Sequence, residues 1–102
     1  MIFERLLNCW DFYYIPQSHT FNCGSCGWYS VTAEHDHFSP ISIEIQERAS
    51  DNQLLDSYSS TIPAGGTFQY TNSNPSPGTA KIVVKVGNVP YVVFGTVCVS
   101  TL

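Results

Sequence analysis

Positive charge is scarce in this sequence of 102 residues, which holds four lysines and arginines against eight aspartates and glutamates. Charged residues make up 12% of the chain, about half of the ~25% that is usual in soluble domains. Four scattered cations cannot neutralise the several phosphates on which nucleic-acid affinity depends, so nucleic acid is excluded as a partner. Sparse charge also removes the repulsion that keeps copies of a protein apart, which favours self-association.

The sequence also lacks long apolar runs. No stretch reaches the roughly 18 residues of a transmembrane helix, so we expect no insertion into a membrane. The N-terminal region carries Glu4, Arg5 and Asp11 and has no signal-peptide core. We therefore expect synthesis in the cytoplasm without a signal peptide.

Helical spacing is missing as well, and from Ser39 onward the pattern has a period of two. Ile41, Ile43 and Ile45 fall on one face of a strand, and that face should point inward. Glu44 and Glu47 are expected to face solvent. With 43% hydrophobic residues the chain can build one core of domain size.

Strand-like stretches alternate with turn signals along the rest of the chain. The expected strands are 27–33, 41–46, 55–61, 67–71, 81–86 and 92–100, and the expected turns are 49–53, 62–66, 72–78 and 87–88. Alternation in the last strand puts Cys98 outward if Val97 and Val99 are buried. The fold class is therefore all-β, a jelly-roll-like β-sandwich with an N-terminal extension or connector arm.

The first seventeen residues are apolar and aromatic, with no turn signal before Pro16. Without a partner they would form an exposed apolar patch. We therefore divide the chain into an N-terminal arm or connector, 1–20, and a β-sandwich domain, 21–102. The arm either folds back as a first strand or docks into another copy.

The four cysteines are Cys9, Cys23, Cys26 and Cys98, many for a cytoplasmic chain and few for a disulfide scaffold. Synthesis in a reducing compartment followed by exposure to an oxidising one would account for both facts. Cys23 and Cys26 are interpreted as structural, paired with each other, with Cys9 or with another subunit. The number of cysteines alone leaves the connectivity open.

A zinc site is the first alternative use of these residues, because Cys23 and Cys26 precede His35 and His37. Their spacing matches no common zinc signature, and we expect neither a metal nor a cofactor. A redox Cys-x-x-Cys motif normally begins a helix, whereas 27–31 has the pattern of a strand.

Catalysis is not expected either. His19, His35 and His37 have no nucleophile motif near them, and Gly65-Gly66 is followed by neither a helix nor a lysine. The sequence thus predicts a protein that is not an enzyme.

The cysteines and the second half together resemble the jelly-roll subunits of bacterial endospore appendages, the Ena pilus family. The resemblance covers 27–102 and rests on Ser-Pro-Ile-Ser-Ile-Glu-Ile, Thr-Ile-Pro-Ala-Gly-Gly-Thr-Phe-Gln-Tyr and the terminal Gly-Thr-Val-Cys-Val-Ser-Thr-Leu. In that family an N-terminal connector bearing cysteines reaches neighbouring subunits and forms disulfides with their β-domains, while sheet edges pair laterally.

The resemblance implies that Cys9 is the connector cysteine, Cys98 the acceptor on the last strand, and Cys23 or Cys26 the early-strand cysteine. All four are intermolecular disulfide candidates. The family connector typically carries adjacent cysteines near its start, whereas this chain has one at position 9.

Two functions follow as hypotheses. The first is a self-assembling subunit of an extracellular fibre or spore-surface appendage, joined to copies of itself by edge pairing and disulfides. The second is a monomeric lectin-like binding module whose platform consists of N-terminal aromatic residues, namely Trp10, Tyr13, Tyr14, Trp28 and Tyr29.

Overall fold

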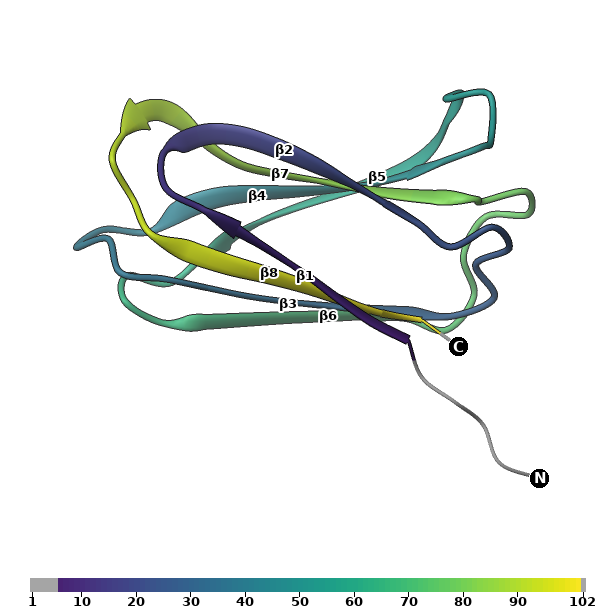
Figure 1. Cartoon of the computed structure of the whole chain (residues 1–102), viewed down its shortest axis with the longest axis horizontal. Helices are drawn as coiled ribbons and strands as arrows, with labels where there is room; N and C mark the ends of the chain where they lie inside the picture. Colours follow the sequence, from purple (N-terminus) through teal and green to yellow (C-terminus); the bar gives the residue numbers. More distant parts are fainter. Residues whose placement is uncertain (1–5, 102) are drawn as a thin grey trace.

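The computed structural model describes residues 6–101, which form eight strands in two facing antiparallel sheets (Figure 1). Sheet A has the order β1-β8-β3-β6 and sheet B the order β2-β7-β4-β5. The strands are β1 Leu6–Phe12, β2 Ile15–Asn22, β3 Tyr29–His35, β4 Ile41–Arg48, β5 Leu54–Ile62, β6 Thr67–Asn72, β7 Lys81–Tyr91 and β8 Gly95–Thr101. The all-β, jelly-roll-like sandwich is confirmed.

The core lies between the sheets and is supplied by alternate residues of the central strands. The expected inward face of β4 is confirmed, because Ile41, Ile43 and Ile45 are all buried. Val97 and Val99 are buried too, and Cys98 points outward between them. Burial of each such aliphatic side chain contributes about 1.5–3 kcal/mol, which fixes the register of these strands.

The N-terminal stretch forms one of the two edges of each sheet. β1 pairs with β8 and β2 pairs with β7. The rings of Trp10 and His19 stack with centroids 5.2 Å apart and link the two edge strands. Of the expected arm, residues 6–12 and 15–20 thus lie in the sheets, joined by the loop 13–14, and residues 1–5 lie outside the described part of the chain.

The last turn differs from the prediction. β7 runs through the expected turn at 87–88 and ends at Tyr91, and β8 begins only at Gly95. Gly87 has a φ of 77°, and a Cβ there would meet the Ile15 Cβ at 2.5 Å, next to a register shift in β2. Gly87 therefore marks a bulge. The turn at 92–94 resembles a strand in sequence because Val93 is buried.

The loops alternate between the two ends of the sandwich (Figure 1). At one end, here called the apolar end, lie loops 13–14, 36–40, 63–66 and 92–94. At the other, the polar end, lie loops 23–28, 49–53 and 73–80 together with the start of β1 and the end of β8. This alternation follows from antiparallel strands that cross between the sheets.

Candidate interaction surfaces

All four cysteines are paired within the chain. Cys9 of β1 bonds to Cys98 of β8, directly opposite in the register, with Cα atoms 4.1 Å apart. Cys23 bonds to Cys26 within the loop at the polar end. The first disulfide therefore ties an edge strand to its neighbour across 89 residues of sequence, and the second closes a short loop.

The structure separates the residues of the zinc alternative. Cys23 and Cys26 precede β3 at the polar end, whereas His35 ends β3 at the apolar end and His37 follows it. Across residues 6–101, no group of three or more His, Cys, Asp or Glu side chains could hold a metal ion.

The two histidines take part in hydrogen bonds that hold the apolar end together. The Nδ1 atom of His35 accepts a hydrogen bond from the His37 backbone N–H at 3.0 Å, and its Nε2 lies 3.2 Å from the Ile62 carbonyl oxygen. Because Nδ1 accepts, Nε2 carries the proton and donates to Ile62. His35 thus joins the end of β3 in sheet A to the end of β5 in sheet B.

The polar end is held together by Glu47, which was expected from the sequence to face solvent. This is a correction, because Glu47 is only 3% exposed and points into the sandwich from β4. Its carboxylate accepts hydrogen bonds from the Tyr29 hydroxyl and the Asn72 amide, both at 2.6 Å, and from the Ser76 backbone N–H at 2.9 Å. The period-two pattern of 41–45, continued by one step, gives position 47 this inward orientation.

This network determines the charge state of its members. Burial opposes ionisation of Glu47, but the hydrogen bonds from Ser76, Tyr29 and Asn72 outweigh it and lower the pKa of this carboxyl below its ordinary value. Burial raises the pKa of the Tyr29 hydroxyl well above its ordinary value, and its hydrogen bond to Glu47 adds to the rise. Glu47 is therefore an ionised acceptor and Tyr29 a neutral donor.

The apolar end leaves large hydrophobic side chains in solvent. Phe38 is 83% exposed and Val92 76% exposed. Tyr13, Tyr14, Val89, Tyr91 and Phe94 are exposed at the same end. Asp36 is the charged residue of the four loops, and its carboxylate accepts a hydrogen bond from the Phe94 N–H at 3.0 Å. An end with this composition is typical of a protein interface.

The four edge strands are also nearly uncharged. β1, β2, β5 and β6 contain no lysine or arginine, and Asp11 and Asp56 are their charged residues. In sheet B the cations Arg48, Lys81 and Lys85 lie instead on the central strands β4 and β7. Monomeric proteins usually place charge, above all lysine, on the edges, because it blocks pairing with another chain.

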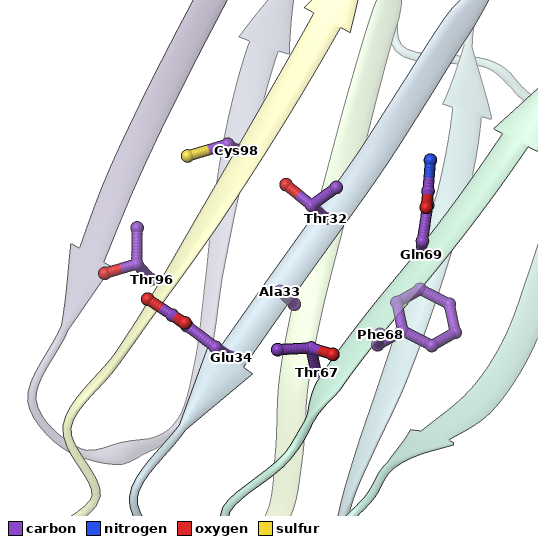
Figure 2. Close-up of a pocket in the computed structure, with 8 residues that line it drawn as sticks. All are labelled: Thr32, Ala33, Glu34, Thr67, Phe68, Gln69, Thr96 and Cys98. Atoms are coloured by element: carbon purple, nitrogen blue, oxygen red, sulfur yellow. The ribbon is translucent and has the colours of Figure 1, made fainter.

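The outer face of sheet A has a shallow hollow of about 550 Å³ (Figure 2). Polar side chains of β8, β3 and β6 stand around it, and Cys98 lies at its border. A second hollow of about 410 Å³ adjoins it toward the apolar end, and the two share Glu34, Thr67 and Thr96.

The aromatic residues of the binding-module hypothesis do not form one surface. Tyr29 is 1% exposed, with its ring in the core and its hydroxyl on Glu47. Trp10 packs against the core and against His19, and Trp28 is half-buried. Tyr13 and Tyr14 remain exposed, both in the loop between β1 and β2.

No family model and no curated protein sequence matches this chain. Solved structures do. The chain is similar to the enzymatically active domain of tailspike protein 4 of bacteriophage CBA120, with a TM-score of 0.64 at 11% identity, over 94% of this chain and 18% of that one. It is also similar to PirA, with a TM-score of 0.50 at 14% identity, over 94% and 93% of the two chains.

A further similarity is to a Bacillus endospore appendage protein of a family of disulfide-linked pili, with a TM-score of 0.46 at 12% identity, over 97% of this chain and 88% of that one. At such identities the tailspike and PirA structures show the fold alone, a β-sandwich. The chain spans under a fifth of the tailspike chain. In the described part of the chain, no helix is long and apolar enough to cross a membrane.

Proposed function

We propose that this chain is a non-catalytic structural subunit that assembles with copies of itself into an extracellular fibre or spore-surface appendage. The observation that carries the proposal is the apolar end, where seven exposed hydrophobic side chains gather with one charged residue among the loops. Water contact with such a surface is unfavourable by about 25 cal/mol for each Å² that a partner could bury. A second copy supplies a matching apolar surface.

A contact between two apolar ends closes a pair, so growth of a fibre needs a second kind of contact. The edge strands provide it. β5 and β6 run along the same side of the sandwich and hold one charged residue, Asp56. Such strands can add a strand from a neighbouring copy through main-chain hydrogen bonds.

A covalent link between copies can use Cys9 and Cys98. Both lie on the outer face of sheet A, in a strand pair where β1 is the edge. If β1 of one copy takes the place of β1 in the next copy, it pairs with β8 of that copy. The β1–β8 hydrogen bonds and the Cys9–Cys98 disulfide then form with the same residues, but between two chains. Exchange of an identical element is a low-cost route to oligomers, because every contact of the closed form is kept. The resemblance of 27–102 to endospore appendage subunits supports this arrangement and a location on the cell or spore surface.

Mixed isotope labelling tests the exchange. Unlabelled and ¹⁵N-labelled chains are unfolded with reductant, mixed, allowed to assemble and oxidise, and digested with trypsin without reduction. Trypsin cuts after Arg5, Arg48 and Lys85, so the Cys9–Cys98 bond joins peptide 6–48 to peptide 86–102. We expect linked peptides with one heavy and one light partner, up to half of the total.

The Cys23–Cys26 bond lies inside peptide 6–48 and provides an internal control for shuffling between chains. If only heavy-heavy and light-light products form in filaments, Cys9 and Cys98 are paired within one chain and the crosslink is refuted.

The second candidate is a monomeric binding module, favoured by the exposure of Tyr13 and Tyr14. Sedimentation velocity at rising concentration separates the candidates. A module remains a monomer of 11.3 kDa, whereas a subunit shifts to larger species.

A further inference from the structure

The outer face of sheet A consists mostly of small polar side chains arranged in rows across the strands. The register aligns them in two neighbouring rows, Asp11-Thr96-Glu34-Thr67 and Cys9-Cys98-Thr32-Gln69. Neighbouring strands lie about 4.8 Å apart, so each row extends roughly 14 Å across the sheet. The hollow of about 550 Å³ lies over these rows (Figure 2), within the size range of about 300–1,000 Å³ typical of small-ligand sites.

Several polar side chains of this face have no hydrogen-bond partner within the described residues. Within residues 6–101 the side chains of Thr32, Glu34, Thr67 and Gln69 form no hydrogen bond with the protein. They offer hydroxyls that both donate and accept, an amide that does the same, and a carboxylate that accepts.

The outer face of sheet B differs in this respect. There Gln46 donates to Glu44 at 3.2 Å and accepts from Arg48 at 2.9 Å, and Lys81 donates to Asn52 at 2.9 Å. Gln46, Arg48 and Lys81 thus hydrogen-bond to neighbouring side chains, whereas the four side chains named above on sheet A do not.

The charge of the hollow narrows the class of ligand. Among residues 6–101, no lysine or arginine lines either hollow, and the second hollow brings Asp11, Glu34 and Asp36 together. This arrangement repels anions such as phosphates, sulfated sugars and uronic acids. A neutral ligand rich in hydroxyl groups matches it.

An apolar element completes the groove toward the apolar end. Tyr13 and Phe94 line the second hollow, both more than half exposed, with ring centroids 5.8 Å apart in an edge-to-face arrangement. Aromatic rings offer the C–H face of a sugar ring an apolar surface, while nearby polar groups fix its hydroxyls.

From these observations we propose that the outer face of sheet A, from Gln69 to Tyr13, is a binding site for a neutral polysaccharide. Glu34, Thr32 and Gln69 hold the sugar hydroxyls, and Tyr13 and Phe94 contact the ring face at one end. The site goes beyond the structural role. Edge pairing leaves its polar rows open, whereas a contact between two apolar ends would cover Tyr13 and Phe94, so glycan binding at that end competes with this contact.

Affinity electrophoresis tests the proposal. The wild-type protein is run through native gels that contain one neutral polysaccharide each (β-1,3-glucan, xylan, mannan, galactan) and through a gel with anionic alginate. We expect retardation in at least one neutral gel and none in alginate. The variant Thr32→Ala/Gln69→Ala should bind at least tenfold more weakly, and Tyr13→Ala should reduce binding separately.

The matched control is Ser18→Ala/Thr20→Ala, two exposed positions on the outer face of sheet B, which should bind like wild type. Three outcomes overturn the site: no retardation in any neutral gel, retardation only in alginate, or equal retardation of Thr32→Ala/Gln69→Ala and wild type. Sedimentation of Thr32→Ala/Gln69→Ala, which leaves the apolar end unchanged, measures assembly independently, so a failed glycan site and a failed assembly are distinguishable.

Discussion

The two ends of this sandwich differ in how their side chains are stabilised. At the polar end the chain satisfies its own buried groups, because Glu47 accepts three hydrogen bonds and the Cys23–Cys26 disulfide closes the neighbouring loop. At the apolar end Phe38, Val92 and their neighbours remain in solvent. The first end therefore contributes to the stability of the single chain, whereas the second holds surface that only another molecule can bury.

The largest expected effect concerns the disulfide between these ends. The variant Cys9→Ser/Cys98→Ser lacks the disulfide that joins residues 89 positions apart in the sequence. Without this constraint the unfolded chain gains entropy, and the free energy of unfolding should fall by about 4–5 kcal/mol in the chain-entropy model. The variant Cys23→Ser/Cys26→Ser lacks a disulfide between residues only 3 positions apart, and its free energy of unfolding should fall by about 2 kcal/mol in the same model. Urea unfolding of both variants measures the difference, and equal losses would contradict the assignment of the long-range bond.

Glu47→Ala should have the next largest effect. It leaves the buried Tyr29 hydroxyl and the Asn72 amide without their acceptor, at a cost of about 3 kcal/mol. Glu44→Ala, on the outer face of the same strand, should cost less than about 1 kcal/mol. A loss at Glu47 as small as that at Glu44 would mean that the polar end is not held by this carboxylate.

Acid should reduce the stability difference between the wild-type protein and the Glu47→Gln variant. Because the folded-state pKa of Glu47 lies below its ordinary value of 4.5, its contribution is present above that value and is lost as pH falls through the folded pKa. Glu47→Gln should thus be less stable than wild type at pH 7, and the gap should shrink at pH values below 4.5. Thermal unfolding from pH 7 to pH 2.5 measures the gap, and a constant gap would contradict an ionised Glu47.

The apolar end should show the smallest effect on stability. Phe38→Ser/Val92→Ser changes two highly exposed residues, so the free energy of unfolding should move by less than about 1 kcal/mol. Self-association should nevertheless fall at least tenfold, as measured by sedimentation velocity. A large loss of stability would show that these side chains support the fold rather than an interface.

Local patterns in the sequence predicted most of the strands, and long-range pairing determined what they missed. Alternation orients Ile41, Ile43 and Ile45 correctly and, continued by one step, also turns Glu47 inward. The expectation that Glu47 faces solvent was wrong because the three donors that stabilise its buried carboxylate come from β3, β6 and the loop after β6, which no local pattern brings together. The pairing of Cys9 with Cys98 depends on β1 lying beside β8, a neighbourhood that no local pattern encodes.

The turn at 92–94 was missed for a related reason. Val93 is buried and its N–H donates to the Tyr13 carbonyl oxygen at 3.2 Å, so a loop residue carries the signature of a core strand. The hollow on sheet A could not be predicted from the sequence either, because its rows of side chains form only when β8, β3 and β6 pair in register.

Negative-stain electron microscopy of the purified, oxidised protein, beside the Phe38→Ser/Val92→Ser variant at the same concentration, tests assembly through the apolar end most directly. Filaments or ordered layers of wild type, together with dispersed particles of the variant, are the predicted result. Uniform single particles of wild type at high concentration, or wild-type-like assemblies of the variant, would contradict it.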